Sequence, residues 1–169
     1  MRISPEKVRR ILALDVRSHR IGYAVFEGSA HLLDFGVTRF KASQTAAPRT
    51  ASLIRKFRPR VLVLRKLARN SGRNRPGTQV ILRSTRNMAK HFSIDLSLIS
   101  EKQLSQTFIK KGARTKHQIA SLLAEDFPEL GWRLPPKRKP WHGQHVNMSI
   151  FDAAVLGIAH RSSKNADAL

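Results

Sequence analysis

The stretch that decides the fold reads Ile11-Leu-Ala-Leu-Asp15-Val-Arg-Ser-His-Arg-Ile21-Gly-Tyr-Ala-Val25. Two short apolar runs, over residues 11–15 and 21–27, flank a polar turn, which is typical of two neighbouring strands. A third run over residues 30–40 carries apolar side chains at mostly alternating positions and predicts another strand. We therefore expect the chain to begin as a three-stranded meander.

Helices and strands alternate after the meander. Residues 46–57 have helical spacing and stop before a proline, and the continuous apolar run 61–64 predicts a buried, parallel strand. Residues 78–91 again have helical spacing, and the alternation from Phe92 to Leu98 predicts a further strand. A meander followed by this alternation predicts a mixed α/β sheet.

The last third of the chain is expected to be mainly helical. A short helix is predicted over residues 100–109, and Thr115 with Gln118 forms a capping-box pattern that begins another. The last helix is predicted over residues 149–160, with a frayed end from Ser162 onward. We find no internal repeat and expect one domain, residues 1–169, with its core over about 10–161.

Composition limits the class of protein. Apolar residues make up 41% of the 169 residues, which is typical of a globular chain. No apolar run approaches the roughly 18 residues that a membrane span needs, so no membrane partner is expected. The absence of cysteine excludes disulfides, thiolate metal sites and cysteine nucleophiles. A cytoplasmic, nucleoid-associated location is the expectation that fits these features.

Charge is the strongest compositional signal. The chain has 32 Lys and Arg against 11 Asp and Glu, a formal net charge of +21. A domain this basic repels itself unless it meets a polyanion, and nucleic acid is the partner that this predicts. An anionic membrane surface is the alternative, but we find no long basic amphipathic helix. The interval between Asp34 and Asp95 contains no acid, which indicates a surface that faces phosphates.

Two aspartates are candidates for metal chemistry. Asp15 ends the first predicted strand, where its carboxylate could hold Mg²⁺ or Mn²⁺ or could simply stabilise its own turn. Asp152 lies near the start of the last predicted helix on an apolar face, where it needs a partner or a cation. Alternatively, Asp152 sits in the first turn and is stabilised by the helix dipole. Hydrolysis of a phosphodiester with two metals needs several such carboxylates together.

Several segments resemble the RuvC family of Holliday-junction resolvases. Residues 11–25 are similar to the opening of that family, and the related YqgF family opens similarly. The segment Asp152-Ala-Ala-Val-Leu-Gly-Ile-Ala-His160 is similar to the last helix of RuvC. The segment Lys110-Lys-Gly-Ala-Arg-Thr-Lys116 and the order of strands and helices follow the same family over roughly residues 10–161.

The resemblance implies a ribonuclease-H-like α/β fold, a mixed five-stranded sheet flanked by helices. It implies that Asp15 and Asp152 are catalytic and are the metal ligands, with Mg²⁺ or Mn²⁺ as the cofactor if catalysis survives. It also implies a homodimer, because a four-way junction is two-fold symmetric.

The departures from the family weaken the catalytic expectation. Leu64 or Arg65 stands where RuvC has a catalytic glutamate, and Ser149 stands where an acidic residue or histidine precedes the last aspartate by three positions. Arg17 replaces a glycine of the turn after Asp15. Two of four carboxylates are therefore missing, and a cation near the metal position opposes metal binding.

Binding residues are better preserved than catalytic ones. A basic, proline-rich segment, residues 131–146, contains Trp132 and Trp141 and is called the tryptophan loop below. Its aromatic rings could stack on bases or anchor the loop on the core, and we expect the core position for Trp132. The expected nucleic-acid-binding residues are Arg17, Arg65, Lys66, Arg69, Arg73, Arg75, Lys110, Lys111, Arg114, Lys116, Lys137, Arg138 and Lys139.

We therefore expect a RuvC-like protein that binds branched or structured nucleic acid, DNA in preference to RNA, with weak or lost nuclease activity. One alternative is an active, Mg²⁺-dependent junction endonuclease in which other ligands, such as His142 and His145 of the tryptophan loop, replace the missing ones. A second alternative is a non-catalytic, RNA-binding component of a ribonucleoprotein.

Overall fold

The computed structural model describes residues 9–28 and 31–167. Its centre is a five-stranded sheet with the order β3-β2-β1-β4-β5. The strands are β1 (Arg10–Val16), β2 (Arg20–Glu27), β3 (His31–Arg39), β4 (Val61–Arg65) and β5 (Asp95–Ile99). The first three form the predicted antiparallel meander, while β4 is parallel to β1 and β5 is parallel to β4.

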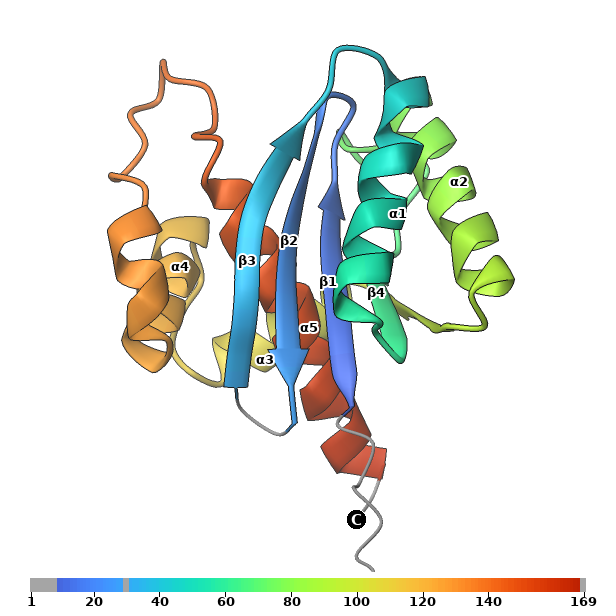
Figure 1. Ribbon diagram of the computed structural model, residues 1–169. Coiled ribbons are helices and arrows are strands. Elements are labelled where there is room, and N and C mark those ends of the chain that lie inside the picture. The colour runs from blue at the N-terminus through green and yellow to red at the C-terminus, as the bar shows by residue number, and fades with distance from the viewer. Residues whose placement is uncertain (1–8, 29–30, 168–169) are drawn as a thin grey trace, which may run out of the picture.

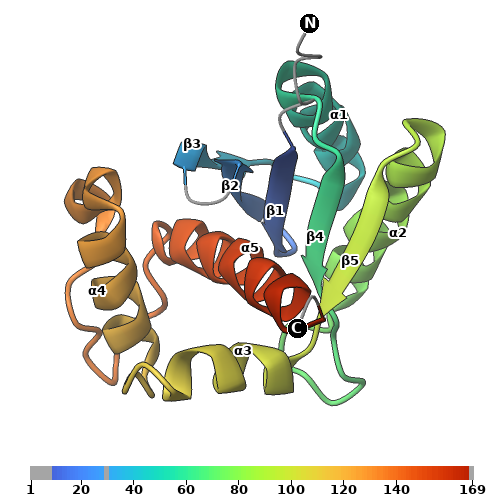
Figure 2. The same ribbon diagram turned by 90° about the horizontal axis from the view of Figure 1, so that it is seen from below.

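Helices cover both faces of the sheet, as Figures 1 and 2 show. The helices are α1 (Ala46–Phe57), α2 (Pro76–His91), α3 (Glu101–Ile109), α4 (Lys116–Asp126) and α5 (Met148–Asp167), with short 3-10 helices at Ser43–Thr45 and Pro128–Arg133. α1 and α2 pack on one face, and α3, α4 and α5 lie on the other. The predicted mixed five-stranded sheet flanked by helices is confirmed.

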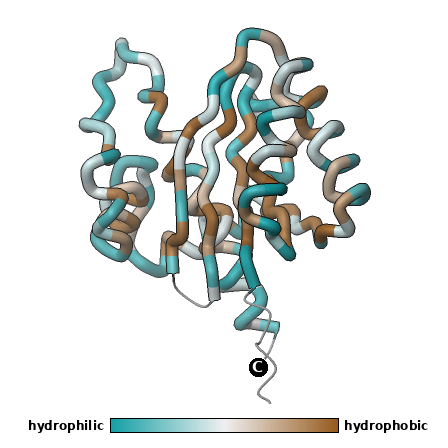
Figure 3. The backbone as a smooth tube through the Cα atoms, in the orientation of Figure 1, coloured by the Kyte–Doolittle hydropathy of each residue, from teal (hydrophilic) through white to brown (hydrophobic). Residues whose placement is uncertain are grey.

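β1 occupies the middle of the sheet because both of its faces are apolar. Leu12 and Leu14 pack in the core beneath α1 and α2, whereas Ile11 and Ala13 pack in the core beneath α5. Figure 3 shows the long hydrophobic stretches that the strands carry. Since side chains alternate along a strand, Asp15 shares the α5 face with Ile11 and Ala13.

Glycines bring α5 unusually close to this face. A Cβ at Gly22 of β2 would lie 2.1 Å from the Ser149 carbonyl oxygen, and a Cβ at Gly157 would lie 2.4 Å from the Phe26 ring. Gly22 is directly opposite Asp15 in the antiparallel register. The start of α5 therefore packs against Gly22 of β2, directly beside Asp15 of β1.

Some predicted boundaries were wrong. β5 begins at Asp95, not at Phe92, because Phe92 caps α2 and Ser93 adopts a left-handed φ of 53° that closes the helix. The predicted fraying from Ser162 is also wrong, since α5 continues to Asp167. The capping box at Thr115 is confirmed.

In the segments that the structure describes, no helix combines the length and apolar character that a membrane span requires.

Candidate functional site

Two buried carboxylates meet where β1 ends and α5 begins. Asp15 is 1% exposed and Asp152 is 6% exposed. The Arg17 side chain lies between them: its Nε donates to Oδ2 of Asp15 at 3.0 Å, and its Nη2 donates to Oδ2 of Asp152 at 3.0 Å. The resemblance placed these two aspartates in one site, and the fold brings them together around a guanidinium group.

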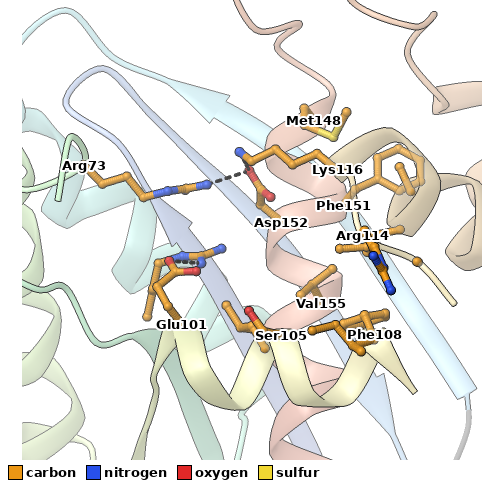
Figure 4. A pocket seen from close by; sticks show the side chains of 16 residues that line it. Arg73, Glu101, Ser105, Phe108, Arg114, Lys116, Met148, Phe151, Asp152 and Val155 are labelled. Atoms are coloured by element: carbon orange, nitrogen blue, oxygen red, sulfur yellow. Dashed lines mark hydrogen bonds and ion pairs between the residues drawn. The ribbon is translucent and has the colours of Figure 1, made fainter. Parts of the chain in front are cut away.

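A second arginine makes the same bridge from another direction. Arg73 comes from the loop between β4 and α2, and its Nη1 donates to Oδ1 of Asp15 at 2.8 Å. Its Nη2 donates to Oδ2 of Asp152 at 3.3 Å, the interaction drawn in Figure 4. Each carboxylate is therefore paired with both arginines.

Two further donors reach Asp152. The Lys116 ammonium from the first turn of α4 lies 3.4 Å from Oδ2, and Nε2 of Gln144 from the tryptophan loop lies 3.3 Å from the same oxygen. Asp152 thus receives four side-chain donors, three of them cationic. The alternative that Asp152 is stabilised by the first turn of its helix is wrong, because α5 begins four residues earlier at Met148.

The electrostatics of the site favour ionised Asp152. Burial alone raises the pKa of this carboxyl, but the charges of Lys116, Arg73, Arg65 and Arg17 outweigh burial, so its pKa lies below the ordinary value. Burial lowers the pKa of Lys116, an effect that Asp152 partly opposes. The carboxylate stays charged because the surrounding cations compensate it.

The sheet register resolves which strand residue faces the site. Leu64 is fully buried in the core beneath α1 and α2, so it points away from Asp15. Val63 lies in the opposite core, and Arg65, two residues on, shares its face. Arg65 lines the same cavity as Asp152, and its Nη1 donates to Oε1 of Glu101 on α3. The residue at the end of β4 that faces the site is therefore a cation, Arg65.

Ser149 does not supply a charge to the site. It is fully buried one helical turn before Asp152, and its Oγ accepts a hydrogen bond of 2.8 Å from Nε of Arg20. Burial, followed by the neighbouring charge of Arg17, lowers the pKa of Arg20. Sequence reasoning missed Arg20, although its position at the start of β2 directly follows the turn that carries Arg17.

The donor set does not fit Mg²⁺ or Mn²⁺. Mg²⁺ is usually held by one or two carboxylates together with waters and substrate phosphates. Here Asp15 and Asp152 are both already paired with Arg17 and Arg73, and Asp152 is also paired with Lys116. Within residues 9–28 and 31–167, no three His, Cys, Asp or Glu side chains form a group that could hold a metal. Of the tryptophan loop, it is Gln144 that reaches Asp152, while His142 and His145 are exposed.

Some of the residues expected to contact phosphates form ion pairs with carboxylates instead. Arg17 and Arg73 are directed at the carboxylates, and Arg65 at Glu101. Ten of the expected residues are exposed: Lys66, Arg69, Arg75, Lys110, Lys111, Arg114, Lys116, Lys137, Arg138 and Lys139. Of these, Lys116 also pairs with Asp152. Lys111 also lies 3.9 Å from Asp126.

Two hollows adjoin the cluster of paired carboxylates and arginines. One, of about 600 Å³, lies between α3, α4 and α5, with apolar Phe108 and Val155 inside and Arg114 and Lys116 among its charged groups (Figure 4). The other, of about 550 Å³, lies beside the turn between β1 and β2. Its basic lining consists of Arg17, Arg20, Arg39, Arg73 and Arg75, with His19 beside them. Arg39 was missed from sequence because only the pairing of β2 with β3 places it beside Arg20.

The core position expected for Trp132 is wrong. Trp132 is 70% exposed and Trp141 is 75% exposed. Leu130 is the residue of the 3-10 helix Pro128–Arg133 that is buried, so Trp132, two residues later, is carried outward. The first three residues of the tryptophan loop belong to this 3-10 helix.

Comparisons with known proteins identify the fold. No family model matches the sequence, and no curated protein matches it. The chain has the ribonuclease-H-like fold of Holliday-junction resolvases. It is similar to Thermus thermophilus RuvC, with a TM-score of 0.68 and 14% identity, over 93% of this chain and 96% of that one.

Other resolvases show the same likeness. The structure of T. thermophilus RuvC in complex with Holliday junction substrate matches with a TM-score of 0.65 and 13% identity, covering 92% of this chain and 95% of that chain. The yeast mitochondrial Holliday junction resolvase Ydc2 matches with a TM-score of 0.63 and 11% identity, covering 91% and 78%. The resemblance to the RuvC family that the sequence indicates is thus confirmed in the fold.

Proposed function

We propose that this protein binds branched or structured nucleic acid, DNA in preference to RNA, and that it does not cleave it by metal-dependent hydrolysis. The observation that carries the proposal is the pair of guanidinium groups of Arg17 and Arg73, each bridging Asp15 and Asp152. These cations lie between the carboxylates on which a catalytic metal would depend.

Loss of metal binding follows from charge. A divalent ion would have to displace Arg17 and Arg73 and would then remain close to Lys116 and Arg65, whose like charges oppose it. Two-metal hydrolysis depends on bound ions to activate the nucleophile and to stabilise the leaving oxygen. The remaining carboxylates serve instead to hold the arginines in place.

The exposed cations that are not paired with carboxylates support nucleic-acid binding. The net charge is +21, and exposed cations follow the loop before α2, the segment before α4 and the tryptophan loop. Solved resolvases with this fold, T. thermophilus RuvC and the fowlpox virus resolvase, have been captured with Holliday junction substrates. That precedent favours branched DNA as the substrate class and, with it, a homodimer matched to the two-fold symmetry of a junction.

Fluorescence anisotropy with labelled nucleic acids tests the proposal. We expect a four-way junction to bind at least about tenfold more tightly than a duplex of the same length, and to bind in EDTA without any requirement for Mg²⁺. Arg75→Glu should weaken binding, whereas Lys90→Glu, at the far end of α2, serves as the matched charge-reversal control. Preference for an RNA hairpin, or binding that requires Mg²⁺, contradicts the proposal.

A further inference from the structure

The two tryptophans of the chain are its most exposed large hydrophobic side chains in the described residues. Trp132 is 70% exposed and Trp141 is 75% exposed, and the chain has no other tryptophan. Both lie in the tryptophan loop. A large aromatic ring left in water offers a flat apolar face that a ligand can cover.

The rings are accompanied by positive charge. The Arg133 guanidinium lies 4.0 Å from the centroid of the Trp132 ring, and the Lys139 ammonium lies 5.6 Å from that of Trp141. Lys137 and Arg138 add two exposed cations, and no acidic residue occurs between Glu129 and Asp152. The matching ligand is anionic and carries exposed planar rings.

Unpaired nucleotides have both properties, whereas a continuous duplex offers only one. A duplex presents phosphates, but its base faces are covered by stacking, so only base edges are available. Single strands and unpaired junction bases expose their π-faces, and proteins bind them by combining a cationic groove with aromatic stacking. The composition of the loop therefore selects unpaired bases within the broader class of nucleic acids.

The loop is held in place beside the carboxylate site. Nε2 of Gln144 donates to Asp152 at 3.3 Å, and Nδ2 of Asn147 donates to the Arg133 carbonyl at 3.3 Å. Pro135, which is buried, and two exposed prolines, Pro136 and Pro140, restrict the backbone. In Figure 1 the loop, coloured orange, extends from the end of the molecule at which α5 begins. Restriction before binding lowers the entropy that is lost when a ligand is captured.

We infer that the tryptophan loop binds unpaired nucleotides, with Trp132 and Trp141 stacking on bases and Lys137, Arg138 and Lys139 contacting the adjoining phosphates. This inference rests on the proposed nucleic-acid-binding function and assigns to it a preference for DNA that contains unpaired bases.

Tryptophan fluorescence tests the inference directly, because both reporters lie in the loop. Titration with a single-stranded thymidine oligonucleotide should quench the emission strongly, and a fully paired duplex of equal charge should quench it weakly. Trp132→Leu and Trp141→Leu should each weaken single-strand binding by at least about fivefold and leave duplex binding within about twofold. Val80→Ala, an exposed apolar site on α2 outside the loop, is the control and should change neither.

The outcomes separate this inference from the function on which it rests. Equal quenching by both DNAs, or unchanged single-strand affinity in both tryptophan variants, overturns the inference while duplex and junction binding still support the proposed function. If neither DNA binds, both proposals are wrong. Thermal unfolding of the variants checks that they stay folded, as expected for exposed positions.

Discussion

At the residue scale, the main feature of the site is that two arginines balance the negative charges of two buried carboxylates. Asp15 and Asp152 would each carry a large desolvation cost if left alone. Arg17 arrives from the adjacent turn, and Arg73 arrives from a loop 58 residues away from Asp15 in sequence. The two guanidinium groups hold the end of β1, the start of α5 and the loop before α2 together, so the two carboxylates and two arginines form a structural ion-pair network.

Removing one arginine should therefore cost stability. For Arg73→Gln we expect the free energy of unfolding to fall by about 1–3 kcal/mol, since Arg17 still compensates part of the charge. Arg75→Gln, two residues away and exposed, is the control and should change it by less than about 0.5 kcal/mol. Urea unfolding of the two variants measures the difference. Equal stability of both would show that Arg73 does not hold the carboxylates in solution.

Rebuilding a metal site tests which strand position faces the aspartates. Arg17→Gly and Arg73→Gln together remove the two guanidinium groups that bridge the aspartates. Adding Arg65→Glu and Ser149→Asp to this variant places four carboxyl groups on the α5 side of the sheet. We expect calorimetry to detect Mg²⁺ binding that is absent from the parent. Leu64→Glu in place of Arg65→Glu is the matched control, and it should fail because Leu64 points into the opposite core. Binding by neither folded variant would refute the alignment to RuvC.

At the element scale, local chemistry was predictable and distant pairing was not. The meander, α1 and the capping box of α4 depend on residues close in sequence, and the structure confirms them. Arg73 was expected to contact phosphate because nothing in its neighbourhood reveals Asp15 and Asp152 as partners. The exposure of Trp132 follows from the geometry of a 3-10 helix, which apolar periodicity does not show.

The contact between α5 and β5 should make stability depend on pH. Nδ1 of His160 lies 2.7 Å from Oγ of Ser97, and burial, then the charge of Lys164, lowers the pKa of the imidazole below 6.5. As pH falls below 6.5, His160 is protonated in the unfolded chain before it is protonated in the folded protein. The free energy of unfolding therefore falls with pH until the pH reaches the folded pKa of His160.

His160→Asn should flatten that dependence. Urea midpoints measured from neutral pH to about one unit below the ordinary histidine value should fall less in this variant than in the parent. His91→Asn, on the other side of the sheet, is the control and should keep the parent's slope. An unchanged slope in the His160 variant would show that another group is responsible.

At the scale of the whole molecule, charge sets affinity and the fold sets where that charge is presented. Only the cations that remain free of carboxylates can release counterions from DNA. Arg73, included among the expected contacts from sequence, is committed to Asp15 and Asp152, so Arg69 and Arg75 of the same loop are the better probes.

Salt dependence measures this electrostatic contribution. If about six phosphates are neutralised, the logarithm of the duplex binding constant should fall with the logarithm of salt concentration at a slope near −5. Arg69→Glu and Arg75→Glu should each make the slope shallower by about one and weaken all sequences alike, because phosphate contacts carry no base information. A slope near zero would contradict binding through phosphates.

One gel measurement addresses the central claim that the protein binds branched DNA while Arg17 and Arg73 block metal-dependent cleavage. A labelled four-way junction is saturated with the protein in millimolar Mn²⁺, and its mobility and strand integrity are read from the same reaction. We predict a retarded junction whose strands remain intact. Paired nicks that disappear in Asp15→Asn and Asp152→Asn would contradict the account and establish a metal-dependent resolvase.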